Sequence, residues 1–443
     1  MGKMEKKALV IGLGISGKSA VKFLLHHGYK VFGVDSRDLK EEVEIKKLRD
    51  LGLEVALEKE LSLDKEFSLV VTSPGVSFSH FLIQEAKKMN IPITGEAELA
   101  FKYTKNRCLA ITGTNGKTTV TSLVEHVLKE SKRKAKALGN IGSPLTEYAI
   151  NPDLEEILVA ELSSYQLETL DSPVFEAAVI LNITPDHLDR YSSFMKYAEA
   201  KAQIQRCIKS GGDLYVDENT AFEFQSLFKQ PFYSMGVLES SYLCLKGIEV
   251  WVGGEYVFSL PKDYAELGPH DALNALAGWA LCSKMGVSSL EYLSGLQTFK
   301  KPSHRIEFIR TVSGVCYYDD SKGTNVDAVI RAVQSMKGSV TLIAGGVDKG
   351  SSYLPWKEAF QGKIRKILLI GEAALKIADE LGLFFNVKIV DSLEDAVKEA
   401  ASSALPGENV LLSPGCSSFD MFRDYAHRGN EFQKFVYLLD DRS

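Results

Sequence analysis

Short apolar runs alternate with segments of helical periodicity along most of the chain. In the first part, strand-like runs and helix-like segments follow each other in pairs: 8–12 with 18–25, 31–35 with 42–51, and 69–72 with 81–89. Runs of this length are typical of buried parallel strands, and each following segment is long enough for a covering helix. The pattern therefore predicts an α/β domain with a parallel sheet.

The same alternation continues in two further blocks. The second block carries strand-like runs at 109–112, 157–161, 178–182, 213–216 and 248–260, with helix-like segments after 117, at 194–208 and at 272–284. The third block carries strand-like runs at 316–318, 340–344, 367–371, 388–390 and 410–413. A polar, proline-bearing stretch at 300–303 separates the blocks and is predicted to be a linker. We predict three α/β domains, at 1–96, 97–301 and 302–443.

The composition excludes several classes of protein. The chain has 443 residues, too many for one core, and its net charge of −6 without a long basic block argues against a nucleic-acid partner. Its six cysteines lack CxxC spacing, so neither a disulfide framework nor a zinc site is indicated. The apolar run near the N-terminus is too short for a signal peptide, and no run approaches a membrane span. We expect a cytoplasmic monomer that binds small molecules and neither a membrane nor a nucleic acid.

A glycine turn between a strand-like run and a helix-like segment carries the strongest chemical signal. The turn reads Gly113, Thr114, Asn115, Gly116, Lys117, Thr118, Thr119. Backbone N–H groups in such a turn point at an anion, Lys117 adds a positive charge, and the Thr118 hydroxyl suits Mg²⁺. The usual P-loop has four residues between its glycines, whereas this turn has two. An ordinary Gly/Asn turn explains the glycines but not Lys-Thr-Thr, so we predict an ATP phosphate site.

A second glycine turn, at 12–17, opens the first domain. The next strand-like run ends at Asp35, the spacing at which an acid meets a ribose hydroxyl. Alone this indicates an NAD-dependent dehydrogenase, but the same turn accepts any diphosphate at a helix N-terminus. Ser36 and Arg37 add a hydroxyl and a cation, and 72–75 is either a wall of the same crevice or an ordinary proline turn.

Two strand ends predict a metal site beside the ATP site. The run at 157–161 ends in Glu161, and the run at 178–182 leads to His187 between two aspartates. These groups suit Mg²⁺, although a solvated glutamate and a helix N-cap explain each motif alone. Glycines around Asn140 allow the backbone to approach a ligand closely.

Six motifs taken together resemble the Mur ligase family, in order and over essentially the whole chain. They are Gly-Thr-Asn-Gly-Lys-Thr-Thr at 113–119, Glu-Leu-Ser-Ser-Tyr-Gln-Leu-Glu at 161–168, Asn-Ile-Thr-Pro-Asp-His-Leu-Asp at 182–189, His-Arg-Ile-Glu at 304–307, Asp-Ser-Lys-Gly-Thr-Asn at 320–325 and Leu-Ser-Pro-Gly-Cys-Ser-Ser-Phe-Asp at 412–420. The first-domain turn with Asp-Ser-Arg and the C-terminal Arg-Gly-Asn-Glu-Phe point to the D-glutamate-adding branch. The resemblance implies a Rossmann-like N-terminal domain that binds a UDP substrate, a central P-loop ATPase-like domain, and a Rossmann-like C-terminal domain that binds the amino acid.

The activity implied by the resemblance is an ATP-dependent, ADP-forming ligation in peptidoglycan precursor synthesis. D-glutamate would be added to UDP-N-acetylmuramoyl-L-alanine (UDP-MurNAc-L-alanine). ATP would first phosphorylate the alanine carboxylate, and the D-glutamate amine would then attack this acyl phosphate through a tetrahedral intermediate. Such chemistry needs cations that neutralise the developing phosphoryl charge.

The resemblance also implies a role for each matching residue. For ATP these are the 113–119 turn, Asn274, Arg305 and Asp320; for the UDP substrate, Gly14, Ile15, Ser16, Ser36, Arg37, Ser73, Gly75, Asn140, Ser163 and His187; for D-glutamate, Thr324, Lys349, Ser418 and Tyr425. Thr118 and Glu161 would hold one Mg²⁺ and His187 a second, helped by a CO₂-derived carbamate on Lys201. Lys117, His187, Lys201 and Lys322 would be the catalytic set. From spacing alone, Lys201 is a surface lysine on a helix, and Arg305 alone would suggest a surface salt bridge.

Two positions depart from the family pattern. Asp271 stands where the family has an amide, and it cannot donate a hydrogen bond as an amide does, so its adenine contact is open while that of Asn274 stands. Tyr425 occupies a position where phenylalanine is also seen.

Three alternatives stay open. Another ligase of the superfamily would share the ATP site and differ in the C-terminal pocket. An NAD-dependent oxidoreductase would use 12–17 and Asp35 but leave the 113–119 turn without a role. A non-catalytic binding module would leave the polar strand ends unexplained. For a ligase, we expect the third domain to rotate on a hinge near 300–303.

Overall fold

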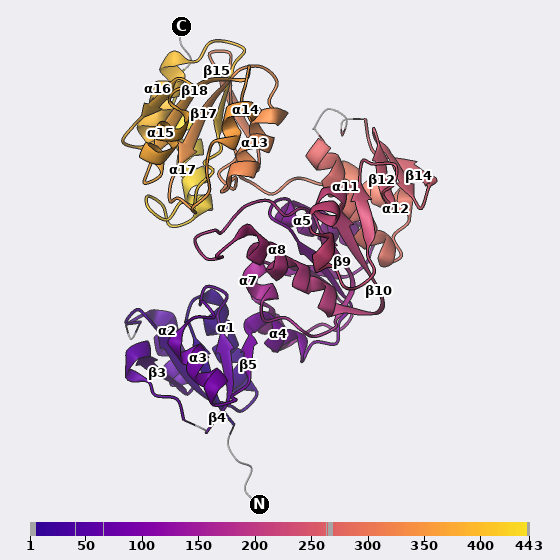
Figure 1. Cartoon of the computed structure of the whole chain (residues 1–443), viewed down its shortest axis with the longest axis vertical. Coiled ribbons are helices and arrows are strands. Elements are labelled where there is room, and N and C mark those ends of the chain that lie inside the picture. The colour runs from indigo at the N-terminus through magenta and orange to yellow at the C-terminus, as the bar shows by residue number, and fades with distance from the viewer. Residues whose placement is uncertain (1–5, 40, 65, 263, 265–268, 441–443) are drawn as a thin grey trace, which may run out of the picture. The chain divides into compact units, whose positions relative to one another are not determined.

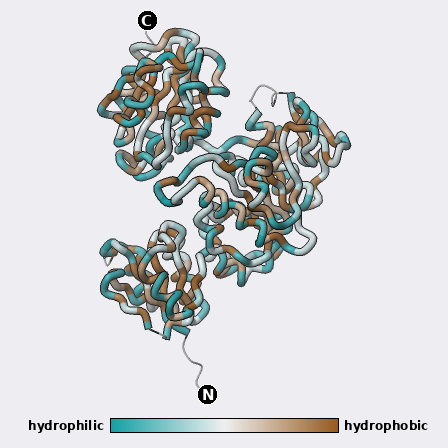
Figure 2. The backbone as a smooth tube through the Cα atoms, viewed as in Figure 1, coloured by the Kyte–Doolittle hydropathy of each residue, from teal (hydrophilic) through white to brown (hydrophobic). Residues whose placement is uncertain are grey.

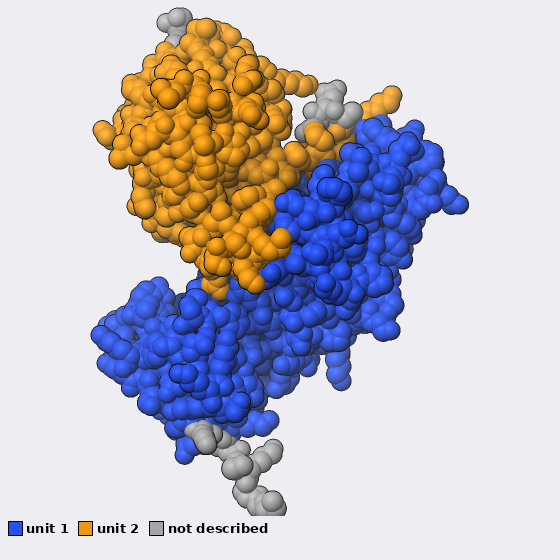
Figure 3. Space-filling model, viewed as in Figure 1, with its two compact units in different colours: residues 1–183, 198–261, 273–299 blue, residues 184–197, 262–272, 300–443 orange. Residues whose placement is uncertain are grey.

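The computed structural model describes residues 6–39, 41–64, 66–262, 264 and 269–440, which form three β-sheets with helices around them (Figure 1). The chain forms two compact units (Figure 3). The first contains 1–183, 198–261 and 273–299, and the second contains 184–197, 262–272 and 300–443. Each unit is described by itself below.

The N-terminal sheet is parallel, with the strand order β3-β2-β1-β4-β5. Its elements are β1 (Lys7–Ile11), α1 (Ile15–His26), β2 (Lys30–Asp35), α2 (Val43–Asp50), β3 (Leu53–Leu57), η1 (Glu58–Glu60), β4 (Phe67–Thr72), α3 (Phe81–Lys88), β5 (Ile93–Gly95) and α4 (Glu96–Phe101). Between β3 and β4 the described residues form no α-helix, and Leu63 from this crossover packs in one cluster with Leu82 and Ile83 of α3. Strand order reverses between β1 and β4, and ligand crevices form at such a point.

The second sheet has nine strands in the order β14-β13-β12-β11-β10-β9-β6-β8-β7. Its strands are β6 (Cys108–Thr112), β7 (Ala135–Gly139), β8 (Ile157–Glu161), β9 (Phe175–Ile180), β10 (Ile208–Asp217), β11 (Tyr233–Gly236), β12 (Leu243–Lys246), β13 (Glu249–Val252) and β14 (Glu255–Ser259). The accompanying helices are α5 (Lys117–Glu130), α6 (Leu145–Ala149), α7 (Ser164–Leu167), α8 (Phe194–Ala202), η2 (Gln203–Cys207), α9 (Glu218–Glu223), η3 (Gln225–Leu227), α11 (Pro269–Lys284) and α12 (Ser289–Thr298). The seven strands from β12 to β7 are parallel, so their carboxyl ends share one edge.

The third sheet has the order β15-β16-β20-β17-β18-β19, and only β15 runs antiparallel. Its elements are β15 (Glu307–Val312), β16 (Val315–Asp319), α13 (Val326–Ser335), β17 (Val340–Gly345), α14 (Pro355–Ala359), β18 (Ile364–Ile370), α15 (Ala374–Leu381), β19 (Val387–Ile389), α16 (Leu393–Ser403), β20 (Asn409–Leu412) and α17 (Tyr425–Tyr437). One core cluster joins the sheet to α13, α14 and α15, and another joins it to α16 and α17. Hydrophobic and hydrophilic residues alternate in short stretches along the chain (Figure 2).

The predicted fold class is confirmed: each sheet is parallel or mostly parallel and is accompanied by helices. The run at 248–260, expected as a small strand, is a hairpin of β13 and β14, because Gly253 and Gly254 reverse the chain at positive φ angles of 59° and 87°. The expected linker 300–303 lies between α12 and β15. The domain boundaries themselves stay a prediction. Among the described residues, no helix is both long and apolar enough to cross a membrane.

The tightest backbone approach in the first sheet gives a test of the fold. A Cβ at Gly17 would lie 1.8 Å from the carbonyl oxygen of Gly12, whereas a Cβ at Gly14 would meet nothing within 4 Å. We expect Gly17→Ala to lower the unfolding free energy of this region by about 3 kcal/mol or more, because backbone must move. Gly14→Ala, the matched control, should change it by less than about 0.5 kcal/mol. Denaturant unfolding of both variants measures this, and equal stabilities would contradict the packing described.

Candidate functional site

The turn after β6 has the geometry of an anion cradle. Gly113 and Gly116 have φ angles of 149° and 87°, and Gly116 is the N-cap of the 14-residue helix α5. These angles favour glycine, and the free N–H groups at a helix start attract anions. A Cβ at Gly116 would lie 2.6 Å from Oδ1 of Asn274, so Asn274 lies against the turn. The structure thus brings together the turn and one of the residues expected to contact ATP.

Asn182 clamps this turn, a role that sequence reasoning missed. Its Oδ1 accepts from the N–H of Asn115 at 2.8 Å, and its Nδ2 donates to the Asn115 carbonyl at 3.0 Å. Its own carbonyl accepts from the N–H of Thr114 at 2.8 Å. Asn182 stood in a recognised motif, but no local sequence signal connects position 182 with position 115.

Two lysines donate to one backbone oxygen inside the site. Nζ of Lys117 lies 2.8 Å from the Gly113 carbonyl oxygen and 2.8 Å from that of Thr114. Nζ of Lys201 lies 2.7 Å from the same Gly113 oxygen, and Lys201 is only 1% exposed. The expectation from spacing alone, a surface lysine, is therefore wrong. Lys201 shares the inner face of α8 with the buried residues Tyr197 and Ala198, which precede it by four and three positions.

Glu161 offers the group best suited to Mg²⁺. It ends β8 with 1% exposure; its Oε1 accepts from Nδ2 of Asn140 at 2.7 Å, and its Oε2 is buried with no hydrogen-bond partner. A buried carboxylate oxygen without a donor costs free energy unless a cation or a water meets it. The residues present therefore fit a divalent cation at Glu161, with Asn140 holding the carboxylate in place.

Sheet order explains why these groups meet. β9, β6, β8 and β7 are consecutive parallel strands, and their carboxyl ends carry Asn182, the 113–119 turn, Glu161 and Asn140 respectively. Ser163, expected to touch substrate, is the N-cap of α7, and its hydroxyl pairs with Gln166. Thr118 lies in the first turn of α5 and is half-buried.

At the N-terminal sheet, the predicted diphosphate residues share one edge. Gly14, Ile15, Ser36, Arg37 and Gly75 are exposed and Ser16 is half-buried, all just after β1, β2 or β4. Ser73 instead supports the turn, since its hydroxyl donates to the Gly12 carbonyl at 2.6 Å.

Asp35 is engaged by its own neighbours. One oxygen accepts from the N–H of Leu13 at 2.9 Å, and the other accepts from the N–H and Nε of Arg37, both at 3.0 Å. Burial opposes ionisation, but the Arg37 bonds outweigh it and lower the pKa of Asp35. Both oxygens of Asp35 already accept hydrogen bonds, and its contact with a ribose hydroxyl stays a prediction.

The loop after β9 places His187 in the second unit. His187 has a φ of 56°, its side chain is 31% exposed, and its N–H donates to Oδ1 of Asp186 at 2.8 Å. Asp186 also accepts from Nζ of Lys349 at 3.1 Å and from Nδ2 of Asn325 at 3.3 Å. Burial opposes ionisation of Asp186, but the charges of Lys349 and His187, together with the hydrogen bonds that both residues donate, outweigh burial and lower the pKa of this carboxyl. Asp186 thus holds the ammonium of Lys349, one of the residues expected to bind D-glutamate.

Arg428 joins the loops that carry most of the expected D-glutamate contacts. Although 1% exposed, it donates to the Ser321 hydroxyl at 3.0 Å, to the Ser321 carbonyl at 2.9 Å and to the Cys416 carbonyl at 3.2 Å. Ser321 in turn donates to the Tyr425 carbonyl at 2.8 Å. The loops tied in this way carry Lys322, Thr324, Ser418 and Tyr425. Burial lowers the pKa of Arg428 to about 10, and sequence reasoning gave this residue no role.

Within these loops, Nζ of Lys322 lies 3.7 Å from the centre of the Tyr425 ring, a cation–π contact. Ser418 is buried and Thr324 is half-buried. All these residues, with His187, Arg305 and Asp320, belong to the second unit, whereas Lys117, Lys201, Glu161, Asn140 and Asn274 belong to the first.

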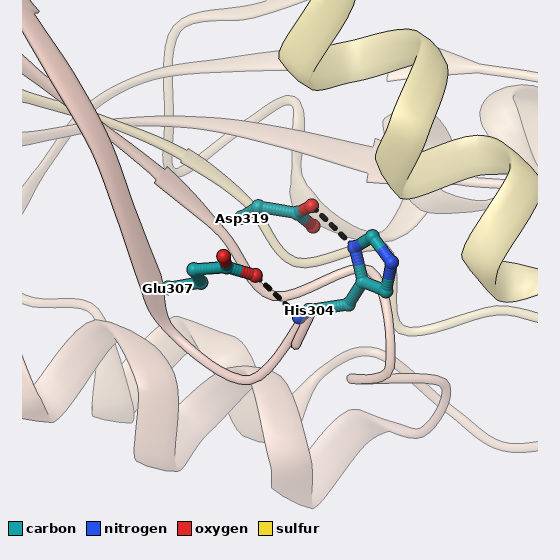
Figure 4. Close-up of side chains that lie close together, drawn as sticks. All are labelled: His304, Glu307 and Asp319. Atoms are coloured by element: carbon teal, nitrogen blue, oxygen red, sulfur yellow. Dashed lines mark hydrogen bonds and ion pairs between the residues drawn. The ribbon is translucent and has the colours of Figure 1, made fainter. Parts of the chain in front are cut away.

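His304, Glu307 and Asp319 lie together in the second unit, with His304 and Asp319 buried and Glu307 half-buried (Figure 4). Their ligand atoms lie within 4.8 Å of one another, a spacing that could suit a metal. Nδ1 of His304 pairs with Oδ2 of Asp319 at 2.7 Å, and Glu307 accepts from the His304 N–H at 2.8 Å. The hydrogen bond to Asp319 raises the pKa of His304. These contacts make the group an internal ion pair flanking Arg305.

Asp320 follows this group and is buried. Its Oδ2 accepts from the Ser413 hydroxyl at 2.6 Å. Burial raises the pKa of Asp320 to about 7, against the opposing effects of the Ser413 bond and the Arg305 charge. This carboxyl therefore changes its charge near neutral pH unless a cation meets it.

Asp320→Asn tests this. A raised pKa means that the carboxyl favours folding fully below the unfolded pKa of 3.8, and this contribution is lost as pH rises toward about 7. The amide does not titrate, so we expect the variant to gain stability relative to the parent over that window. At about 1.4 kcal/mol per pKa unit, the gain is roughly 4 kcal/mol.

Denaturant unfolding at several pH values measures this gain. The exposed Asp391→Asn is the matched control, expected to differ from the parent by no more than about 0.5 kcal/mol. A stability difference between Asp320→Asn and the parent that does not change with pH would contradict the assignment.

Comparisons with known proteins match this layout. Three families match successive parts of the chain: the Mur ligase MurD-like N-terminal domain at 6–95, the Mur ligase middle domain at 111–282, and the Mur ligase glutamate ligase domain at 304–416. Among solved structures, the chain resembles UDP-N-acetylmuramate-alanine ligase MurC from Thermotoga maritima, with a TM-score of 0.59 and 20% identity over 98% of this chain and 99% of that one. The chain also resembles MurF from Acinetobacter baumannii, with a TM-score of 0.61 and 16% identity over 96% of this chain and 93% of that one. At these identities the likeness shows the fold alone.

Sequence relatives are much nearer. The UDP-N-acetylmuramoylalanine--D-glutamate ligase of Protochlamydia amoebophila is 48% identical over 437 residues, 98% of both chains. The enzyme of the same name from Caldanaerobacter subterraneus subsp. tengcongensis is 38% identical over 450 residues, covering 98% of this chain and 99% of its own. With matches of this extent over all three sheets, this chain belongs to the Mur ligase family.

Proposed function

We propose that this chain joins D-glutamate to UDP-MurNAc-L-alanine with hydrolysis of ATP to ADP and phosphate, a cytoplasmic step of peptidoglycan precursor synthesis. The observation that carries the proposal is 48% identity over nearly the full length to a protein named for this reaction. Mur ligases are ATP-dependent amide-bond ligases that use Mg²⁺. The cradle at 113–119 beside the unpartnered Glu161 oxygen supports the same chemistry.

The reaction would proceed through an activated carboxylate. The γ-phosphoryl group of ATP passes to the alanine carboxylate, giving ADP and an acyl phosphate. The amine of D-glutamate attacks the acyl carbon and loses a proton, and phosphate leaves from the tetrahedral intermediate as the amide forms. A free carboxylate is a poor electrophile, and phosphorylation supplies the leaving group.

In this proposal the 113–119 turn holds the ATP phosphates through its backbone N–H groups. Nζ of Lys117, now on two carbonyl oxygens of the turn, lies where it can move onto a phosphate oxygen. Asn274 lies against Gly116 and would contact the nucleotide. Arg305 and Asp320 are proposed to complete the ATP contacts from the second unit.

Glu161 and Thr118 would hold one Mg²⁺, and His187 would hold a second with help from Lys201. A bound Mg²⁺ neutralises phosphoryl charge as it develops. Asn140 keeps the Glu161 carboxylate oriented through its 2.7 Å bond.

Lys201 is proposed to carry a CO₂-derived carbamate. Two ammonium groups within hydrogen-bond distance of the Gly113 oxygen repel each other, and the burial of Lys201 makes its charge costly. A carbamate turns one of these cations into an anion that can ligate Mg²⁺. The buried position of Lys201 next to the ATP cradle supports this reading.

The two ends of the ligation would bind in different parts of the chain. The uridine diphosphate is proposed to lie on Gly14, Ile15, Ser16, Ser36, Arg37, Ser73 and Gly75, with Asn140, Ser163 and His187 toward the muramoyl end. D-glutamate is proposed to contact Thr324, Lys349, Ser418 and Tyr425, with Lys322 nearby. For D-glutamate, the supporting observation is that Arg428 ties most of these loops together.

Turnover with the complete substrate set tests the proposal. Purified protein with ATP, Mg²⁺ and UDP-MurNAc-L-alanine should release phosphate when D-glutamate is added, and not when L-alanine or a diamino acid replaces it. The measurement is phosphate release together with mass analysis of the product. Stimulation by a different amino acid would assign the chain to another branch of the superfamily, and no stimulation by any of these amino acids would end the proposal.

Lys201→Ala tests the carbamate. We expect kcat to fall by roughly 10–100-fold or more, the effect of losing a group that holds a catalytic metal. After CO₂ depletion, bicarbonate should restore activity to the parent and leave the variant unchanged. Lys196→Ala, an exposed lysine on the same helix, is the control and should keep the parent's response. Full activity of Lys201→Ala would remove the carbamate from the mechanism.

A further inference from the structure

Glu96 is a buried carboxylate where helices α1, α4 and α6 pack on one another. Glu96 begins α4 directly after β5 and is 2% exposed. Its Oε1 accepts from the N–H of Thr146 at 2.6 Å and from the Thr146 hydroxyl at 2.7 Å. Its Oε2 is buried without a hydrogen-bond partner. Burying a carboxylate here costs more free energy than burying an apolar side chain of similar size, so packing alone does not explain this residue.

The contact continues beyond Thr146. Its hydroxyl oxygen lies 2.7 Å from the hydroxyl of Ser19 in α1. Because the Thr146 proton points to Glu96, its oxygen accepts here and Ser19 donates. Ser19 is 5% exposed and Thr146 is fully buried. The three residues form one directed chain from α1 through α6 to α4.

The two ends of this chain lead to different parts of the proposed UDP-substrate site. Ser19 lies one turn after Ile15 and Ser16, where α1 begins beside the glycine turn. Thr146 lies in α6, which follows the loop that carries Asn140, and Asn140 holds Glu161. The chain therefore joins the first-domain turn to the loop beside the metal ligand. α1, α4 and α6 also pack directly on one another within the first unit.

Burial raises the pKa of Glu96, and the two Thr146 bonds only partly oppose this. A hydrogen bond to a carboxylate in such surroundings contributes more than one at the surface. Contacts of this kind can hold two loops at a fixed separation.

We propose that Ser19, Thr146 and Glu96 are positioning residues whose hydrogen bonds fix the spacing between the start of α1 and the Asn140 loop. A fixed spacing favours a ligand long enough to touch both places, that is, a nucleoside diphosphate carrying an extended acidic sugar. The fixed spacing should neither strengthen nor weaken the binding of a shorter nucleotide, which touches only one of the two places. The inference rests on the proposed function, since it assumes that one substrate spans the turn and the loop.

The test compares two ligands on variants of the full chain. Thr146→Val keeps the shape of the side chain and removes its hydroxyl, and Ser19→Ala removes only the donor at the other end. Binding of UDP-MurNAc-L-alanine and of UDP alone is measured by calorimetry, alongside KM for each substrate and kcat. We expect Thr146→Val to raise the dissociation constant of UDP-MurNAc-L-alanine about tenfold. The dissociation constant of UDP and the KM for ATP should stay within about twofold of the parent's values. Ser19→Ala should show the same selective effect at smaller size, and Thr146→Ser should restore the parent's values.

Thr104→Val is the matched control. The Thr104 hydroxyl donates only to the Ala100 carbonyl at the end of α4, so its loss should leave both ligands unaffected. Equal weakening of UDP and UDP-MurNAc-L-alanine by Thr146→Val and Ser19→Ala would mean local damage and overturn the proposal, as would no weakening of either ligand. In both cases D-glutamate-dependent turnover of the parent leaves the proposed function intact. A parent without that turnover overturns the proposed function, and the positioning role with it.

Discussion

The site of the first unit depends on the carbonyl oxygen of Gly113, which accepts from both Lys117 and Lys201. Only a residue tolerant of a φ of 149° directs that carbonyl in this way after β6. Two ammonium groups and the N–H groups of a helix start then concentrate positive potential at one point of the sheet edge. An anion is the natural occupant of such a point. Glu161, on the neighbouring strand, supplies the opposite charge and leaves an oxygen for a cation. The turn and Glu161 together therefore suit a phosphate with a bound metal ion better than a phosphate or a metal ion alone.

Strand order turns separate sequence motifs into one site. Asn182, the 113–119 turn, Glu161 and Asn140 end four consecutive parallel strands, so they share one edge of the sheet. At that edge Asn182 contacts the turn, and Asn140 contacts Glu161. In the second unit, hydrogen bonds rather than strand order bring the loops together. There the loops around Ser321 and Cys416 are held by a buried arginine, and the start of α17 is tied in through Ser321. Rigid strands fix the proposed ATP side, whereas hydrogen bonds between loops fix the proposed amino-acid side.

The sequence predicted those features that depend on neighbouring residues alone. The glycine turns, the strand-end position of Glu161 and the alternation of strands and helices follow from periodicity and turn chemistry, and the structure has them. Burial of Lys201 could not be read in this way, because a lysine interrupts the apolar stripe of α8 and pattern alone assigns it to solvent. Asn182 and Arg428 act over 67 and 107 positions of sequence, and no short-range signal carries such pairings. Asp35 has the right spacing for a ribose, and in the structure it accepts from Leu13 and Arg37.

Buried charge shows where this fold favours chemistry over stability. Apolar residues of similar volume would pack at Lys201, Glu161, Asp320 and Arg428 without the desolvation cost that each charge brings. Each of these groups contacts a loop at the end of a strand rather than the middle of a sheet, so none is needed to close a core. Buried charged groups gathered at strand ends are more typical of a reaction site than of a scaffold. The His304 and Asp319 pair differs from them, because Oδ2 of Asp319 already accepts from Nδ1 of His304 and from Nε2 of Gln433.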